Sequence, residues 1–128
     1  MKKFSEIEYV RPDMEVEKEK VRAYTEALKN VKSYEELRGL FMEEKEREDV
    51  WATMAEVAQV RYTVDTRDSF YEGEVQFWNE TVPAIRLLMQ KAEKVILESP
   101  FIKEFAEEFG DFFVKNMEVG QKLADDCI

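Results

Sequence analysis

Apolar residues recur every three or four positions along most of this chain, a period typical of α-helices with one buried face. Residues 1–11 show only mild alternation and end before Pro12, so they are predicted to form an extended arm. Helices are predicted over about 13–31, 33–64, 68–98, 100–109 and 111–124. The predicted fold class is therefore all-α, a single helical domain over residues 1–128. It is either an antiparallel helical bundle or a long helical hairpin with shorter C-terminal helices.

The first two helices have clear N-terminal signals. Asp13 is a favourable N-cap, and Ser33 with Glu36 fits a capping box, in which each side chain bonds the other's backbone amide. The expected buried positions are Val21, Tyr24, Leu28 and Val31, followed by Leu37, Leu40, Phe41, Val50, Trp51, Met54, Val57 and Ala58. The charged stretch 43–49 interrupts the second stripe, and we expect it to be solvated or to project past the core.

The third helix is predicted to follow a tight corner at residues 65–69, which are rich in capping residues. Pro83 lies inside its pattern and should kink it, because proline cannot donate to the preceding turn. Ser99-Pro100 should start the fourth helix and Gly110 should end it. Asp111 is the expected cap of a final helix whose apolar positions are Phe112, Phe113, Met117 and Leu123.

Composition narrows the function classes. The net charge of −10 argues against binding nucleic acid or anionic membranes, where basic residues must neutralise phosphates. Charged residues break every apolar run before it could span a membrane, and no signal peptide is visible. The single cysteine, Cys127, cannot form an intrachain disulfide. A cytoplasmic protein is therefore expected.

The absence of histidine excludes most catalytic and zinc-binding motifs, including Ser-His-Asp triads and HExxH. A calcium loop starting at Asp65 fails, because Arg67 and Phe70 occupy positions that require an oxygen ligand and a glycine. Cys127 has no histidine to activate it as a nucleophile. No catalytic, cofactor-binding or metal-binding residue is predicted in this chain. A carboxylate-based hydrolase stays open, although no pair among the 29 acidic residues stands out.

The corner between the second and third helices carries the one distinctive polar group. Arg61, Asp65, Asp68 and Tyr71, together with Tyr62, could form a network there. Structural fastening is favoured over ligand binding, because buried polar groups normally satisfy one another.

Several segments resemble a known family. They are Tyr9-Val-Arg-Pro-Asp13, the stretch from Arg61 to Glu74, Phe77-Trp78 with Pro83, Glu98-Ser-Pro-Phe101 and Glu107-Glu-Phe-Gly110. In this order, over about residues 4–115, they resemble the N-terminal region of the oligoendopeptidase F family. Those proteins are zinc metallopeptidases of the thimet-oligopeptidase type.

The resemblance implies an all-α domain that forms part of the wall and cover of a deep channel, in which short unstructured peptides are cleaved. It also implies zinc in the full-length family, held by an HExxH helix and a later glutamate that this chain lacks. We therefore expect a non-catalytic piece of a larger peptidase, with its catalytic lobe as partner. The alternative is a standalone acidic module for protein binding or for self-association through an exposed apolar face.

Overall fold

A computed structural model describes residues 3–126 of the chain, and within this range the ordered elements are all helical. A short 3-10 turn at Phe4–Glu6 precedes α1 (Met14–Lys29), α2 (Tyr34–Val64), α3 (Ser69–Leu97), α4 (Ile102–Phe109) and α5 (Asp111–Asp126). The predicted all-α fold class is confirmed. Cys127 lies outside the described residues.

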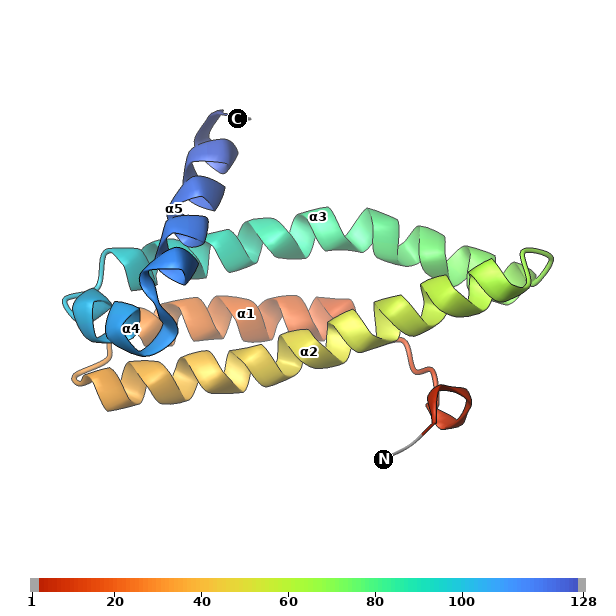
Figure 1. Ribbon diagram of the computed structural model, residues 1–128, viewed down its shortest axis with the longest axis horizontal. Coiled ribbons are helices and arrows are strands. Elements are labelled where there is room, and N and C mark those ends of the chain that lie inside the picture. Colours follow the sequence, from red (N-terminus) through yellow and green to blue (C-terminus); the bar gives the residue numbers. More distant parts are fainter. Residues whose placement is uncertain (1–2, 127–128) are drawn as a thin grey trace.

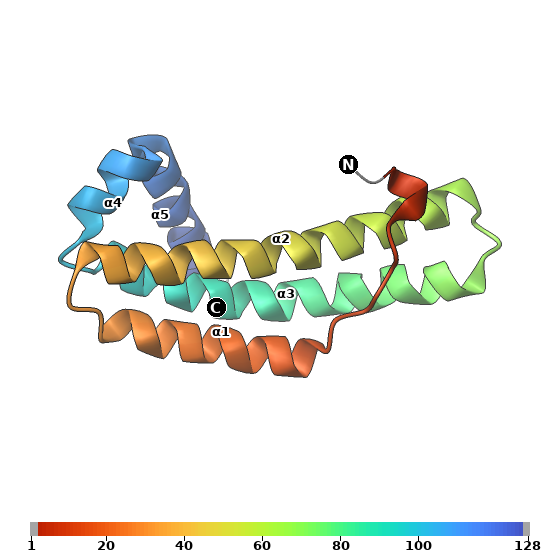
Figure 2. The ribbon, with the colours of Figure 1, turned by 90° about the horizontal axis from the view of Figure 1, so that it is seen from below.

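The three longest helices form the body of the domain. α2 runs antiparallel to both α1 and α3, which lie side by side (Figures 1 and 2). The α2–α3 hairpin continues well beyond the start of α1, so its corner projects from the bundle as a pair of helices. At the opposite end the chain turns through α4, and α5 packs across the last part of α3 (Figure 1).

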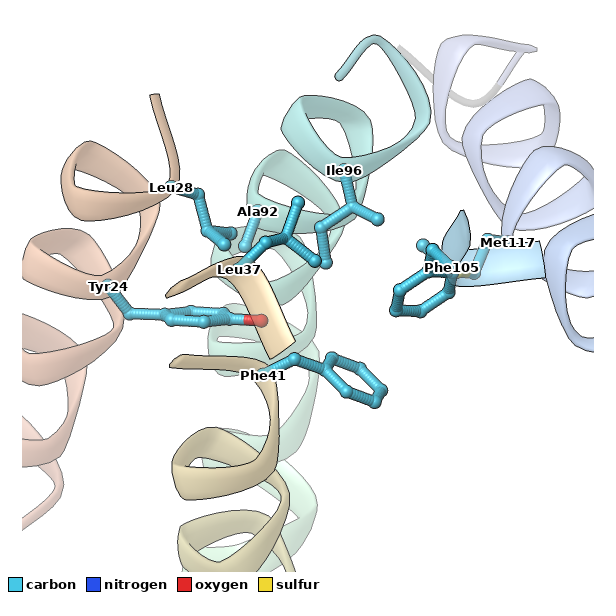
Figure 3. Packing of buried hydrophobic residues seen from close by; sticks show 8 residues of the cluster. All are labelled: Tyr24, Leu28, Leu37, Phe41, Ala92, Ile96, Phe105 and Met117. Atoms are coloured by element: carbon cyan, nitrogen blue, oxygen red, sulfur yellow. The ribbon is translucent and has the colours of Figure 1, made fainter. Parts of the chain in front are cut away.

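One core cluster joins all five helices at the end of the bundle where α2 begins and α3 ends (Figure 3). Phe105 of α4 is fully buried, and its ring meets that of Phe41 edge to face, with centroids 5.0 Å apart. The buried members are Tyr24, Leu28, Leu37, Phe41, Ala92, Ile96, Phe105 and Met117. This cluster explains why the short α4 is held firmly: burying one phenylalanine contributes about 2–3 kcal/mol.

A second cluster lies further along the hairpin, where α1 begins. Its buried members are Met14, Val21, Trp51, Ala58, Trp78 and Ile85. Trp51 of α2 and Trp78 of α3 are its largest buried side chains and join the two helices at this level.

The helix ends follow the capping signals in part. The Asp13 carboxylate accepts from the amide of Val16, and Ser33 accepts from the amide of Glu36. The predicted return bond of the capping box is wrong in detail, since Glu36 accepts from the amide of Lys32 rather than that of Ser33.

The predicted start of the fourth helix is also wrong by two residues. The Ser99 hydroxyl accepts from the amide of Phe101 in a tight turn, and α4 begins only at Ile102. Gly110 ends α4 as predicted, with a φ of 96° that favours glycine. Asp111 is the first residue of α5 rather than its cap. α3 continues through Pro83 as one helix.

The helical period predicts burial for several residues that the structure leaves exposed. Val50, Phe112 and Leu123 were expected in the core, and Phe70 also falls in the helical pattern of the third helix, but all four are largely exposed. Val50, Phe70 and Phe112 directly adjoin Trp51, Tyr71 and Phe113, which pack inward, and Leu123 lies on the outer side of α5. Adjacent residues of a helix point in different directions, so the buried face does not take both.

The charged stretch 43–49 neither projects nor is fully solvated. α1 lies against this part of α2, so Glu44 is only 2% exposed and pairs with Arg47, one turn away. The pattern missed this because a glutamate at a core-facing position has no apolar signature.

Candidate functional site

The most connected polar group in the domain ties the N-terminal arm to the α2–α3 hairpin. Its centre is Glu74 of α3, whose side chain is buried. The Tyr9 hydroxyl donates to Glu74 Oε1 over 2.7 Å, and Arg11 Nε donates to the same oxygen over 2.9 Å. Arg11 Nη2 donates to the other oxygen, Oε2. Trp78 Nε1 donates to the Tyr9 oxygen over 3.0 Å and completes the network.

The charges in this network hold one another in their ionised forms. The hydrogen bonds from Arg11 lower the pKa of Glu74 below its usual value. Burial and the neighbouring Glu74 carboxylate raise the pKa of Tyr9 to about 12, so this phenol stays a donor. The Arg11 guanidinium also lies over the ring of Phe77, 4.0 Å from its centroid. These groups bind one another and are arranged for attachment rather than for proton transfer.

The arm then crosses α2. The Val10 amide donates to the sulfur of Met54, and Arg61 Nη2 donates to the carbonyl of Ile7 over 2.6 Å. Met54 and Arg61 lie one turn to either side of Val57, which is 1% exposed. The arm therefore crosses the face of α2 on which Val57 lies.

The structure divides the predicted corner residues into two groups. Arg61 donates to the Tyr71 hydroxyl over 2.9 Å, and both contact the arm. Asp68 caps α3 by accepting from the amides of Phe70 and Tyr71, while Asp65 pairs with the exposed Arg67. Tyr62 is half-buried on α2.

The residues that motif reasoning did not assign to this site are Tyr9, Arg11, Glu74 and Trp78. Their contacts join positions 63 to 69 residues apart, and nothing in the helical period indicates such a pairing. The only available signal was that all four lie in the segments that resemble oligoendopeptidase F.

A second cluster of titratable side chains, formed by Glu44, Glu48 and Glu93, lies where α1, α2, α3 and α5 meet. Burial raises the pKa of Glu48 to about 7, and burial also raises the pKa values of Glu44 and Glu93. The cavity between them has a volume of about 80 Å³. Because ligand sites usually measure roughly 300–1,000 Å³, this cluster is too confined for a substrate.

Zinc does not fit the described part of the chain. Over residues 3–126, no three side chains of His, Cys, Asp or Glu are placed to hold a metal ion. The same residues include no helix with enough apolar length to cross a membrane.

The peptidase M3 N-terminal domain model matches residues 4–124. The chain belongs to this family. The family is a peptidase family, and the arm, corner and core of this domain all fall within the matched region.

Solved peptidases show the same domain. A structure of PZ peptidase A with an inhibitor superposes with a TM-score of 0.89, and one assigned as oligoendopeptidase F superposes with a TM-score of 0.90. Each is 28% identical to this chain and covers 94% of it. The chain spans only 21% of the length of either peptidase. The search of curated proteins gave no match.

Proposed function

We propose that this domain is the non-catalytic, substrate-gating and supporting domain of an M3-type zinc oligoendopeptidase. The observation that carries the proposal is the match of almost the whole chain to the N-terminal domain family and to one fifth of two peptidases. In this proposal zinc and its ligands belong to a catalytic lobe, which is the partner of this domain in the cytoplasm. The domain would form a wall of the substrate channel and exclude folded proteins.

The projecting α2–α3 hairpin suits such a role. Its exposed surface includes Val60, Val64 and Phe70, which are apolar and close to the corner. The arm holds these two helices together beyond the start of α1. A rigid projection can narrow a channel, whereas a frayed helix pair could not keep a fixed opening.

The activity of the chain itself gives the first test. The chain is incubated with zinc and a quenched fluorescent oligopeptide, and no turnover is expected. Turnover that persists after repeated purification would contradict the non-catalytic role. Reading the gene on both sides of this segment is the second test: an HExxH helix in the same frame supports the proposal, and a stop codon directly after Ile128 contradicts it.

Gating is tested in the peptidase that contains this domain. Cleavage of a short peptide is compared with cleavage of a long unfolded protein, for the wild type and for Glu74→Ala. We expect the variant, with its arm loosened, to cleave the long substrate relatively faster. An unchanged ratio in a folded variant would contradict the gating role.

A standalone self-association module is the second candidate, and the outer face of α5 favours it. Phe112, Val119 and Leu123 repeat at helical spacing, and each is more than half exposed. Light scattering tests this alternative. A dimer that becomes monomeric in Phe112→Ser/Leu123→Ser supports it, and a wild-type monomer contradicts it.

A further inference from the structure

A groove with a positively charged rim runs between α1 and α3, on the side of the bundle away from α2. These helices lie side by side in both ribbon views (Figures 1 and 2). The groove has a volume of about 470 Å³, which lies within the usual range for ligand sites. Its apolar lining comes from Leu88 and Val95 of α3.

The charge of the groove is opposite to that of the chain. Four basic side chains line it, Arg22 and Lys29 from α1 and Lys91 and Lys94 from α3, against two acidic ones, Glu26 and Glu98. The whole chain carries −10. A local excess of positive charge on such an acidic protein attracts anionic groups to this one face.

The two α3 lysines are available to a ligand. Arg22 pairs with Glu19 and Lys29 pairs with Glu26, each within α1. Both pairs are exposed, so each contributes little. No ion pair involves Lys91 or Lys94 within residues 3–126, and both side chains are exposed.

We propose that this groove binds a short acidic peptide segment in extended form, with its carboxylates on Lys91 and Lys94 and its apolar side chains against Leu88 and Val95. The proposal goes beyond gating, because it needs neither the catalytic lobe nor cleavage of the bound segment. Its function would be to hold an acidic region of a peptide outside the catalytic centre.

The dimensions and mixed charge favour a peptide over a phosphate ligand. Arg22 and Lys29 are two helical turns apart, about 10 Å along the axis, which three or four extended residues span. Glu26 and Glu98 can accept from peptide amides, but they repel a dense polyanion. Alternating carboxylate and aliphatic side chains match a groove with charged edges and an apolar floor.

The experiment titrates the isotopically labelled 128-residue chain with a capped peptide of sequence ELELE, followed by amide NMR. The matched peptides are QLQLQ and KLKLK. We expect saturable shifts on the facing parts of α1 and α3 with ELELE, weaker binding with QLQLQ and none with KLKLK. Raising the salt from about 0.05 to about 0.5 M should weaken ELELE binding, because these charges are exposed.

Charge reversal tests the assignment to the two lysines. We expect Lys91→Glu/Lys94→Glu to weaken ELELE binding by roughly threefold to thirtyfold, as for the loss of two exposed ion pairs. Lys103→Glu/Lys122→Glu makes the same change of charge on α4 and α5, outside the groove, and should bind within about twofold of wild type by the same reasoning. If the first variant fails to fold, Lys91→Gln/Lys94→Gln replaces it.

Three results would overturn the proposal. The first is no saturable binding of ELELE, or equal binding of QLQLQ. The second is equal weakening by the control variant, which would show only a response to net charge. The third is displacement by pyrophosphate at lower concentration than ELELE itself requires, which would make the groove a phosphate site.

Discussion

Replacing Glu74 with alanine should detach the N-terminal arm and destabilise the domain. Glu74 is 6% exposed and accepts three hydrogen bonds, one from Tyr9 and two from Arg11. Hydrogen bonds to charged groups contribute about 1.5–3 kcal/mol each. Because the Arg11 side chain is 47% exposed, water can replace part of its interaction. We therefore expect a loss of about 2–4 kcal/mol in the free energy of unfolding.

Urea unfolding followed by tryptophan fluorescence measures this loss, because Trp51 and Trp78 both lie in the second core cluster. With a slope of about 2 kcal/mol per molar urea, the midpoint should fall by about 1–2 M. Arg11→Met should cost less, and the double variant Glu74→Ala/Arg11→Met should be less destabilised than the sum of the two. A coupling of about 1–2 kcal/mol is expected for groups in direct contact.

Acid titration gives an independent check. The pKa of Glu74 is lowered in the fold, so its contribution is present above the usual carboxylate pKa and is lost as the pH falls through the lowered value. When the pH is lowered from neutral to below about 4, the free energy of unfolding should therefore fall less for Glu74→Ala than for the wild type. A midpoint within about 0.2 M of wild type at neutral pH, or strictly additive single variants, would refute the central role of this carboxylate.

Three further predictions test the core, a helix end and the acidic cluster. Phe105→Ala should cost about 3–5 kcal/mol in urea unfolding, whereas Phe112→Ala, at 78% exposed, should cost less than about 0.5 kcal/mol. Gly110→Ala should destabilise the domain by about 1–3 kcal/mol, because Gly110 has a positive φ. Gly39→Ala should instead stabilise it by about 0.5–1 kcal/mol, because Gly39 lies inside α2 and no atom is near the added carbon. Equal effects of the two substitutions would contradict this reasoning. The raised pKa of Glu48, about 7, means that its burial lowers stability progressively as the pH rises from about 4.5 to 7. Glu48→Gln should remove this slope and gain about 1–2 kcal/mol at pH 8, after allowance for partial exposure, and parallel pH profiles would contradict it.

Local signals in the sequence predicted the helices because their causes are local. Asp13, Ser33 and Asp68 accept amides within the next three residues, so the caps can be read from adjacent positions. Errors appear where a neighbour decides the outcome. Whether Phe112 or Phe113 is buried depends on how α5 packs, and Glu44 is buried because α1 lies over it. Neither the exposure of Phe112 nor the burial of Glu44 can be predicted from the sequence of a single helix.

The candidate site was predicted only at its edge. Arg61 donates a hydrogen bond to Tyr71, in line with the predicted network at the corner. Both residues also contact the N-terminal arm, which was not predicted. The central carboxylate, Glu74, could not be distinguished among 29 acidic residues by spacing. Its partners lie 63 and 65 residues away, and only the folded chain brings them together.

The position of this network shows what the segments around Tyr9, Arg61 and Glu74 do in the fold. α1 starts at Met14, and beyond that level no other α-helix of residues 3–126 covers the hairpin. A pair of helices needs a third element to cover the apolar residues along its seam, so without the arm the face of α2 that carries Val57 would be open to water. The arm takes the place of the missing helix, and it is fixed by Glu74 on one side and by Arg61 on the other. The polar network therefore fastens the arm to both helices of the hairpin at the level where α1 ends its cover.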